Sequence, residues 1–472
     1  MAFSGLAFIF HFLPIFLIAY YITKPRYRNG VLLVGSLIFY AMGNPAYLIL
    51  LLISVLINFL MVNRIYNLNN RADKEGSKKT KQKVWLILVL AYDFVMLFAF
   101  KYVDFAIDIF NRVSGSECPS LGIALPLGIS FYTFQMISFA IDVYRAKYTK
   151  RITMFHFVTY ATMFPQIISG PITRYSDVQR ELESYRYVKP KDIEKGISFF
   201  AVGLSYKVLL ADKIASLWTD IWRVGVEGID VSTAWLGAWA YSFEIYFDFA
   251  GYSLMAIGVA AMLGFRLPQN FRDPYASKSM TEFWRNWHMT LGKWFRDYLY
   301  IPLGGNRKGR FRMIVNTAIV WLFTGLWHGA SYNFIIWGAF LALVICIEKT
   351  GFGKWLEKTK VLGHIYMIIL IPISWTIFNI TDIGQLFAYL GKMFFIGSGS
   401  VVGNGMQKLL ELLMTYKWML VACIFFATPY PYKWIRKYHK SWIVKIILFA
   451  AFWYSVYQLA RSGSNPFIYF GF

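Results

Sequence analysis

Long apolar runs, separated by short basic segments, are the feature that most constrains this chain. A helix needs about 20 mostly apolar residues to cross a lipid bilayer. Runs close to this length occupy residues 5–22, 30–43, 46–63, 84–100, 121–141, 195–212, 233–263, 313–328, 333–348, 364–380, 416–429 and 443–460. The pattern predicts an all-α, polytopic transmembrane protein with about 11–13 spans.

Two further apolar stretches are too short to cross a bilayer on their own. One covers residues 384–396, and the other, 154–170, contains Pro165, Gly170 and Pro171. The second is expected to be a broken, re-entrant segment, because irregular backbone survives at membrane depth only where protein or a cavity surrounds it. Residues 5–22 lack a preceding basic segment and a small-residue cleavage site, so we expect a first span and not a removed signal.

The composition excludes several other classes of protein. Of the 472 residues, 57% are hydrophobic and 15% are charged, whereas soluble domains carry about 25% charged residues. A soluble globule cannot bury so much apolar surface, because its surface grows nearly as fast as its mass. This argues against a soluble enzyme and a disordered chain. Cys118, Cys346 and Cys423 show no paired spacing, so a disulfide scaffold is not expected either.

The formal net charge of +23 comes from Lys and Arg residues that cluster beside the apolar runs. The basic segments are 64–83, 266–312 and 433–445. In polytopic helical proteins such segments mark the cytoplasmic side, so we predict that all three face the cytoplasm and that the uncharged N-terminus lies outside. The same distribution argues against nucleic acid as a partner. One membrane domain is expected over residues 1–472, with core motifs at 121–350 and C-terminal spans at 364–460.

His328 ends the apolar run 313–328 and is the clearest ionisable side chain in such a run. Ionisable groups at membrane depth are costly and need a reason. Desolvation disfavours the imidazolium, so this histidine is expected to stay neutral and able to accept a proton from a hydroxyl. The position alone is equally consistent with a core histidine bonded to a backbone carbonyl.

Residues 281–298 carry an aromatic pattern with helical spacing. One stripe contains Trp284, Trp287, Leu291, Trp294, Phe295 and Tyr298, with Lys293 and Asp297 roughly opposite. We therefore expect an interfacial amphipathic helix with its apolar face in the membrane. His288 falls roughly 70° from the centre of the stripe. At that edge it points either into a cavity or into the lipid headgroups.

Two weaker signals accompany these histidines. The turn after the aromatic helix contains Gly304, Gly305, Asn306, Arg307 and Lys308, which either holds phosphates through backbone N–H groups and charge or is an ordinary basic turn. Glu244 and Asp248 are spaced i, i+4 on one face of an apolar helix. They line a polar cavity or bridge neighbouring helices. No metal site is predicted.

The chain contains several unusual motifs. They are YFDFAGYS at 246–253, FWRNWH at 283–288, WFRDYLYIPLGGNR at 294–307 and GLWHG at 325–329, with PLGISFYTFQ at 126–135 and FPQIISGPI at 164–172. These motifs resemble the membrane-bound O-acyltransferase (MBOAT) family, most closely its bacterial branch, the membrane subunit of alginate O-acetylation. The resemblance covers residues 1–350 well and the C-terminal spans by hydropathy only. Relatives often carry Asp where this chain has Leu254, so any role of that carboxylate is absent here.

The resemblance implies a ring of tilted helices around a central tunnel in the bacterial cytoplasmic membrane. It implies that His328 is the catalytic base inside the tunnel and that His288 lies on its cytoplasmic side. The acetyl donor would be a cytoplasmic thioester, acetyl-CoA, used as a substrate with no tightly bound cofactor. The acetyl group would pass outward to a surface polysaccharide, directly or through an extracytoplasmic partner acetyltransferase of the SGNH type.

On this basis the donor is predicted to bind between the helix 281–298 and the turn 304–309, with Trp284, Arg296, Arg307 and Lys308 among the contacts. Direct transfer is expected, since no Ser or Cys stands in a recognisable nucleophile motif. Two alternatives remain open at this point: a subunit of the teichoic-acid D-alanyl transfer type, which uses an acylated carrier protein, and a transporter of polysaccharide precursors. The sequence does not identify the acceptor polymer.

Overall fold

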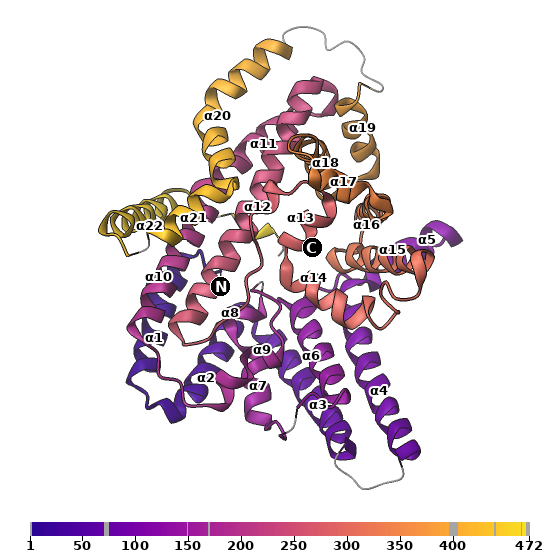
Figure 1. Ribbon diagram of the computed structural model, residues 1–472, viewed down its shortest axis with the longest axis vertical. Helices are drawn as coiled ribbons and strands as arrows, with labels where there is room; N and C mark the ends of the chain where they lie inside the picture. Colours follow the sequence, from indigo (N-terminus) through magenta and orange to yellow (C-terminus); the bar gives the residue numbers. More distant parts are fainter. Residues whose placement is uncertain are drawn as a thin grey trace. The chain divides into compact units, whose positions relative to one another are not determined.

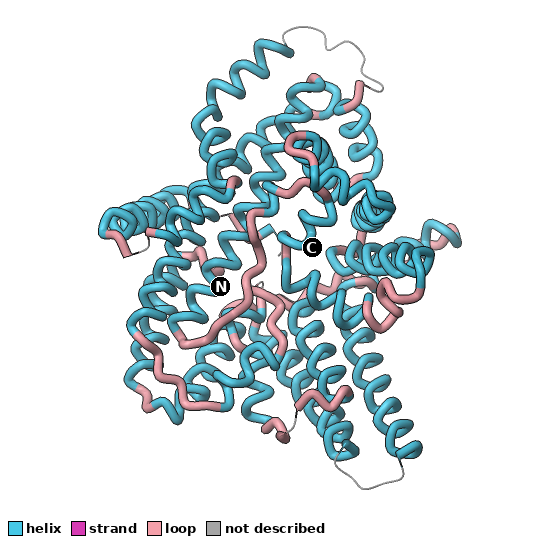
Figure 2. Tube along the Cα trace, in the orientation of Figure 1, coloured by secondary structure: helices cyan, strands magenta, loops and turns pink. Residues whose placement is uncertain are grey.

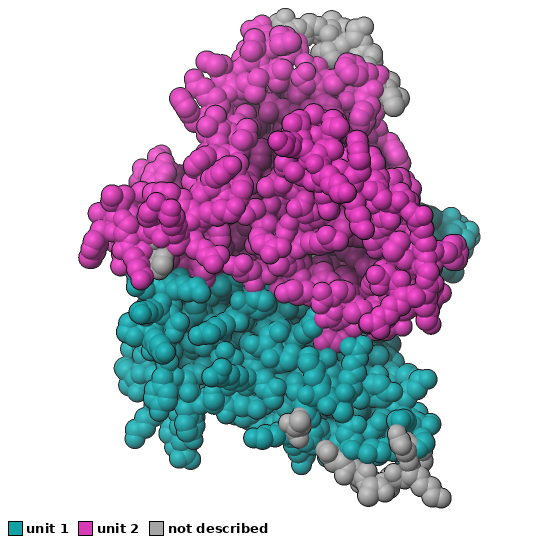
Figure 3. All heavy atoms as spheres, viewed as in Figure 1, with its two compact units in different colours: residues 1–197, 256–268 teal, residues 198–255, 269–472 magenta. Residues whose placement is uncertain are grey.

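The computed structural model describes residues 2–69, 75–148, 150–168, 170–395, 405–438, 440–463 and 465–468. Within these ranges the chain is helical and contains no β-strand (Figures 1 and 2). This confirms the all-α class. The chain forms two compact units, residues 1–197 with 256–268 and residues 198–255 with 269–472 (Figure 3). The boundary falls inside α10 (Pro190–Ser205) and α12 (Val231–Met262), so both helices contribute to both units.

The first unit is built from helices of very different length. They are η1 (Phe8–Phe12), α1 (Leu13–Ile22), η2 (Pro25–Tyr27), α2 (Arg28–Ala41), α3 (Pro45–Asn69), α4 (Glu75–Lys101), α5 (Val103–Ser114), α6 (Ile129–Tyr144), α7 (Met154–Thr162), α8 (Phe164–Ile167) and α9 (Tyr175–Glu183). Helices α3, α4 and α6 pack side by side (Figure 1). The ring of Phe164 lies 5.1 Å from that of Phe16 and 5.3 Å from that of Phe39, measured between centroids. Aromatic packing of this kind holds the short α8 inside the unit.

The second unit contains the remaining elements, which include both histidines of interest. They are η3 (Tyr206–Ala211), α11 (Asp212–Val224), η4 (Val226–Gly228), η5 (Pro274–Ala276), α13 (Met280–Asn286), α14 (Met289–Phe295), η6 (Arg296–Tyr300), α15 (Gly309–His328), α16 (Tyr332–Ile347), η7 (Glu348–Phe352), α17 (Gly353–Lys358), α18 (Leu362–Asn379), α19 (Ile383–Met393), α20 (Gly405–Ala427), α21 (Pro429–Lys437) and α22 (Trp442–Ser462).

Helices α15 and α16 approach each other closely because glycines face the contact. A Cβ atom added at Gly325 would lie 2.3 Å from the Phe334 carbonyl oxygen, and one added at Gly338 would lie 2.6 Å from the Trp321 carbonyl oxygen. Small residues of this kind let the backbones of membrane helices come together. The close contact fixes the end of α15, where His328 lies.

Among the described residues, seven helices are long and apolar enough to cross a membrane, and the apolar stretch Phe8–Ile22 is shorter. The number is below the expected 11–13 because α2 and α6 have only 14 and 16 residues and because runs 5–22 and 195–212 are each divided between two helical segments. Run 154–170 is broken into α7 and α8, as predicted. Run 121–141 differs from the prediction: its helix begins only at Ile129, after Gly128 with φ of 76°. A Cβ at Gly128 would meet the Ile167 carbonyl oxygen at 2.3 Å, so the irregular start is packed in place.

The expected basic loop 64–83 is also largely helical. Helix α3 continues to Asn69 and α4 begins at Glu75, while residues 70–74, including Arg71 and Lys74, lie outside the described residues. Lys, Gln and Glu are good helix formers, so the ends of both spanning helices extend beyond their apolar parts.

The carboxylate of Asp248 serves a structural role in the second unit. The Lys207 ammonium lies 2.6 Å from Asp248 and 2.8 Å from Asp212, and all three side chains are largely buried. The backbone N–H of Ile468 also donates to Asp248, at 2.8 Å. Of the two readings of the Glu244 and Asp248 pair, the structure supports a bridge between helices for Asp248.

Candidate active site

His288 lies at a break between α13 and α14, with φ of 41° and ψ of 52°. One continuous amphipathic helix over 281–298 was predicted, and that prediction is wrong. A non-glycine residue with positive φ is uncommon, and such residues are enriched at functional sites. The break turns the His288 side chain away from the position that helical periodicity gives it.

Contacts with the preceding loop hold this break on both sides. The Arg272 N–H donates to the Asn286 carbonyl at 3.0 Å. The Met289 N–H donates to the Asn270 carbonyl at 2.9 Å, and the Thr290 hydroxyl donates to the Asn270 side chain at 2.6 Å. These bonds replace the helical hydrogen bonds lost at the break. Nothing in the hydrophobic period of residues 281–298 reveals them.

The aromatic stripe of residues 281–298 packs against protein and not against lipid. Trp287, Leu291, Trp294, Phe295 and Tyr298 are all buried. The Trp284 ring lies 4.9 Å from that of Trp321 and 5.5 Å from that of Trp337, and the Trp287 ring lies 4.7 Å from that of Trp375. The expected membrane-facing orientation is therefore wrong. A stripe of this kind serves equally well as the buried face of a helix, and sequence cannot distinguish the two.

The His288 side chain is 1% exposed, so it does not lie at headgroup level. Its ring meets the Phe249 ring edge-on, with centroids 4.7 Å apart. Neither ring nitrogen has a hydrogen-bond partner on another described residue. Burial lowers the pKa of His288 from its usual value near 6.5 to about 3. The imidazole is therefore neutral at physiological pH, with both nitrogens available to a bound molecule.

A carboxylate fixes the start of α13. Glu348 accepts hydrogen bonds from the backbone N–H groups of Met280, at 2.6 Å, and Thr281, at 2.7 Å, and its side chain is buried. Ser279 completes the cap by accepting from the Glu282 N–H at 3.0 Å. A negative charge is favourable at the N-terminus of a helix, where four N–H groups lack helical partners. The cap ties α13 to the end of α16.

His328 is the last residue of α15 and is 4% exposed. Its ring is surrounded by three aromatic rings, those of Trp327 at 4.9 Å, Trp337 at 5.0 Å and Phe378 at 5.2 Å. Gly329 follows, and a Cβ there would come within 2.1 Å of the Phe334 ring. The histidine thus lies in a tight aromatic box at the C-terminal end of a helix. That helix end carries partial negative charge, which stabilises a cation formed on the imidazole.

Trp327 connects the two histidines. Its ring centroid lies 4.9 Å from that of His328 and 6.3 Å from that of His288. The structure therefore brings together two histidines that lie 40 positions apart in the sequence. Both histidines stand in motifs that the sequence shows, whereas no local pattern predicts Trp327 as their shared neighbour.

A cavity of about 180 Å³ opens beside His288. Its lining includes the half-buried side chain of Trp284 and two basic side chains, Arg296 and Lys349. The Lys349 ammonium donates to the Thr317 hydroxyl at 2.6 Å and lies 5.1 Å from the centre of the Tyr300 ring. No carboxylate belongs to the described residues that line this cavity, although Arg296 Nε donates to the neighbouring Asp297 carboxylate at 2.6 Å. Two cations, a neutral imidazole and aromatic walls suit an anionic ligand with an apolar part.

The glycine turn lies next to this cavity without lining it. A Cβ at Gly305 would be 3.7 Å from the ring of Tyr300, which does line the cavity. The N–H groups of Gly304 and Gly305 already donate to the carbonyls of Ile301 and Tyr300, at 2.9 Å each. Asn306, Arg307 and Lys308 are exposed. Any anion here would thus meet side chains, since the two glycine amides are engaged in the turn.

Lys349 was missed by sequence reasoning. It follows directly after the apolar run 333–348, in a pair with Glu348, and the charge at the end of a run was the available signal. Of the predicted donor-site residues, Trp284 and Arg296 line the cavity, whereas residues 304–308 do not. Within the described residues, no group of three His, Cys, Asp or Glu side chains is placed to bind a metal ion.

Comparison with known proteins identifies the family. The model of MBOAT, the membrane-bound O-acyltransferase family, matches residues 145–390. The chain is 35% identical to a probable alginate O-acetylase AlgI of Pseudomonas putida, over 100% of both chains. It is 31% identical to a peptidoglycan O-acetyltransferase of Helicobacter pylori, over 91% of this chain and 86% of the relative.

A third relative shares a smaller part of the chain. This is a teichoic acid D-alanyltransferase of Streptococcus thermophilus, 30% identical over 50% of this chain and 59% of the relative. The family model includes α13, both histidines and the cavity residue Lys349. The chain therefore belongs to the membrane-bound O-acyltransferase family.

Proposed function

We propose that this enzyme takes an acetyl group from a cytoplasmic thioester, acetyl-CoA, and passes it across the membrane for O-acetylation of a surface polysaccharide. The relatives named as alginate O-acetylase and peptidoglycan O-acetyltransferase support this substrate class. The observation that carries the proposal is the neutral, buried His288 on a cationic cavity, joined through Trp327 to His328.

In the proposed reaction His328 is the general base. Its imidazole takes the proton from an acceptor hydroxyl, and the oxygen attacks the thioester carbonyl carbon. The C–S bond then breaks, and the thiolate of the donor leaves and takes up a proton. The C-terminal end of α15 and the three surrounding rings stabilise the imidazolium formed in between. General-base catalysis of this kind is worth about 10² to 10⁴ in rate.

We propose that the donor enters along the cavity beside His288. Arg296 and Lys349 neutralise phosphates of coenzyme A, and Trp284 packs against its apolar parts. Arg307 and Lys308, on the exposed turn next to Tyr300, extend the same positive surface outward, with Gly304, Gly305 and Asn306 shaping the turn. His288 polarises the thioester carbonyl or holds the donor, as an imidazole N–H donor can.

The orientation that fits this reaction has the N-terminus outside the cytoplasmic membrane and the donor cavity toward the cytoplasm. The acetyl group then reaches the polymer directly or through an extracytoplasmic partner acetyltransferase of the SGNH type. Membership of the family argues against a transporter of polysaccharide precursors, since the family is one of acyltransferases.

A second donor fits one specific observation. Arg307 and Lys308 are exposed on a turn whose glycine amides are already bonded, which suits docking of an acidic carrier protein better than enclosure of a small molecule. The teichoic acid D-alanyltransferase among the relatives makes this the second candidate.

Inverted membrane vesicles carrying the enzyme and its acceptor polymer test the proposal. Labelled acetyl-CoA is added outside the vesicles, and label in the polymer is counted after the lipid has been extracted. Wild type should label the polymer, and a His364→Ala variant, changed on α18 away from the cavity, should do the same. Label that appears only when an acylated carrier protein replaces acetyl-CoA would select the second candidate. No label with either donor would reject acyl transfer from the cytoplasm.

A further inference from the structure

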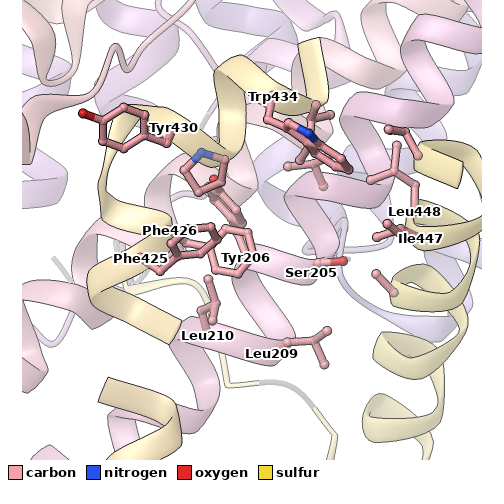
Figure 4. Close-up of a pocket in the computed structure, with 15 residues that line it drawn as sticks. Ser205, Tyr206, Leu209, Leu210, Phe425, Phe426, Tyr430, Trp434, Ile447 and Leu448 are labelled. Atoms are coloured by element: carbon pink, nitrogen blue, oxygen red, sulfur yellow. The ribbon is translucent and has the colours of Figure 1, made fainter. Parts of the chain in front are cut away.

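A second, larger cavity of about 540 Å³ lies away from the histidines, between the end of α10, η3, the end of α20, α21 and α22. Figure 4 shows side chains from these elements converging on it, with Tyr206, Leu210 and Phe426 together on one side and Ile447 and Leu448 opposite. Its size falls within the range of about 300–1,000 Å³ that is typical of small-ligand sites. None of the residues that line this cavity takes part in the proposed acyl transfer.

The lining offers almost no hydrogen-bonding partner to a ligand. Of the 15 lining residues, Ser205 carries the one aliphatic hydroxyl group. This hydroxyl already donates a hydrogen bond to the Ala201 carbonyl, at 2.8 Å. Most of the others are aliphatic or aromatic. A polar metabolite would lose its hydration here without replacement. A hydrocarbon chain makes no hydrogen bonds with water, so it would lose none on entering the cavity, and burying its apolar surface would be favourable.

Two of the helices around this cavity are well placed to meet lipid. Both α20 and α22 are candidate spans, and only 6% and 22% of the residues in their most apolar windows are buried. Phe425 and Ile447, which line the cavity, are 53% and 48% exposed, so the cavity opens as a groove to the outer surface of these helices. Its contacts on α22 run from Val444 to Ala451, a rise of about 10 Å along the helix axis.

The polar end of the groove is strongly basic. Tyr430 and Trp434 of α21 point toward the groove (Figure 4). Lys433 and Lys437 follow these two residues by three positions each and so lie beside them on the helix, whereas Arg436 lies on the far face; all three basic side chains are exposed. Lys440 follows, just before α22, and is also exposed. From residue 412 onward the sequence contains no Asp or Glu. Amphipathic helices with aromatic and basic faces lie at the lipid headgroup level and attract anionic lipids.

We propose that the groove holds one acyl chain of an anionic diacyl phospholipid, and that Lys437 and Lys440 bind its phosphate at the start of α22. The apolar lining selects a hydrocarbon chain, and the positive charge of Lys437 and Lys440 selects a negative headgroup. The bound lipid belongs to the membrane leaflet on the same side as the basic segment 433–445. It holds α20, α21 and α22 together and takes no part in acyl transfer.

Native mass spectrometry of the purified full chain tests this site. The protein is reconstituted in nanodiscs of equal parts phosphatidylglycerol and phosphatidylcholine and then released into the gas phase. Wild type should retain phosphatidylglycerol. Ala451→Phe fills the groove and should lower the retained lipid by at least about tenfold. Ala450→Phe, one position along the same helix and not in the lining, should retain as much lipid as wild type. Ala451→Leu provides a milder filling variant with the same expected direction if the Phe variant does not fold.

The headgroup contact has its own test. The double variant Lys437→Gln, Lys440→Gln should lose about fivefold in phosphatidylglycerol retention for each lysine removed. The double variant Lys354→Gln, Lys358→Gln, on exposed positions of α17, is the matched control and should lose none.

Three results would contradict the proposal. Equal lipid retention in Ala451→Phe and Ala450→Phe would show that no acyl chain occupies the groove. Equal retention of phosphatidylglycerol and phosphatidylcholine by wild type would show that the site does not select an anionic headgroup. A dimer peak that disappears only in Ala451→Phe would assign the groove to a second copy of the chain and reject the lipid.

Discussion

At the residue scale, the unusual conformation and burial of His288 have a consequence for stability. In the unfolded chain a histidine has a pKa near 6.5, whereas in the folded protein the pKa of His288 is about 3. Between these values the unfolded chain binds the proton and the folded chain does not. Stability therefore falls as the pH is lowered through this window, because the folded state keeps the imidazole neutral.

The variant His288→Asn isolates this effect, since Asn tolerates positive φ and does not titrate. We expect wild type to lose about 1.4 kcal/mol of stability per pH unit relative to the variant as the pH falls from 6 to 4. Thermal unfolding in detergent, followed at several pH values, measures the difference. Parallel unfolding curves for the two proteins would show that His288 is charged or exposed in the folded state.

The cations of the cavity predict a second residue-level result. In the double variant Arg296→Gln, Lys349→Gln, the KM for acetyl-CoA should rise about tenfold or more while kcat changes less, because contacts with phosphates hold ground and transition states alike. The double variant Arg307→Ala, Lys308→Ala should also raise KM, by less, since those residues lie outside the cavity. Titration of acetyl-CoA on the purified wild type and both variants measures these changes in KM and kcat. A KM that stays constant in both variants would show that the donor binds neither in the cavity nor at the turn.

Sequence reasoning succeeded for residues whose signal is local. His328 was singled out as an ionisable group at the end of an apolar run, and it is the buried last residue of α15. It did not identify Lys349, whose place on the cavity depends on α16 and η7 bringing it beside Tyr300. Such proximity follows from tertiary packing, which a single sequence does not encode in any local pattern.

At the element scale, the close contact of α15 and α16 places His328. In Gly325→Ala the new methyl would stand 2.3 Å from the Phe334 carbonyl oxygen, so the helices must move apart. We expect a loss of stability of about 1–3 kcal/mol and a strong loss of activity. Gly30→Ala, inside α2 with open space around the new methyl group, is the matched control and should keep normal stability and activity. A Gly325→Ala protein with normal activity would show that the spacing of α15 and α16 is unimportant for the site.

The charged cap of α13 predicts another element-level effect. Glu348→Gln removes the charge that accepts from Met280 and Thr281 and turns an N–H₂ group toward one of those donors. We expect destabilisation of about 1–3 kcal/mol. Glu227→Gln, on an exposed position, should change stability by less than about 0.5 kcal/mol. Chemical unfolding of both variants measures the effect, and a Glu348→Gln protein as stable as wild type would contradict the proposed cap.

The elements themselves could be predicted in part. Apolar runs such as 46–63 and 84–100 appear as spanning helices, because length and hydropathy are strong local signals. The run 281–298 has a good helical period and still breaks at His288, because Asn270 and Arg272 supply competing hydrogen bonds. The period also could not tell a lipid-facing stripe from a buried one.

At the scale of the whole molecule, the charge distribution predicts an orientation in the membrane. Single cysteines introduced at Lys78 and Lys308, in a Cys118→Ser background, should resist a membrane-impermeant thiol reagent in intact cells. The native Cys118 is exposed and is separated from Lys78 by the spanning helix α4, so in the unmodified chain it should react from outside. Labelling of the introduced cysteines in intact cells would reverse the orientation and, with it, the side on which the donor enters.

The central claim is that His328 takes the proton of the acceptor hydroxyl, and the transfer rate tests it most directly. Wild type, His328→Ala and His364→Ala are compared at saturating donor, with labelled acetyl transfer to the polymer measured as a rate per folded protein. We predict that His328→Ala slows transfer about 10² to 10⁴-fold, while binding of the donor and the amount of protein in the membrane stay as in wild type and His364→Ala remains active. A His328→Ala enzyme that transfers acetyl groups at a rate close to wild type would contradict the account.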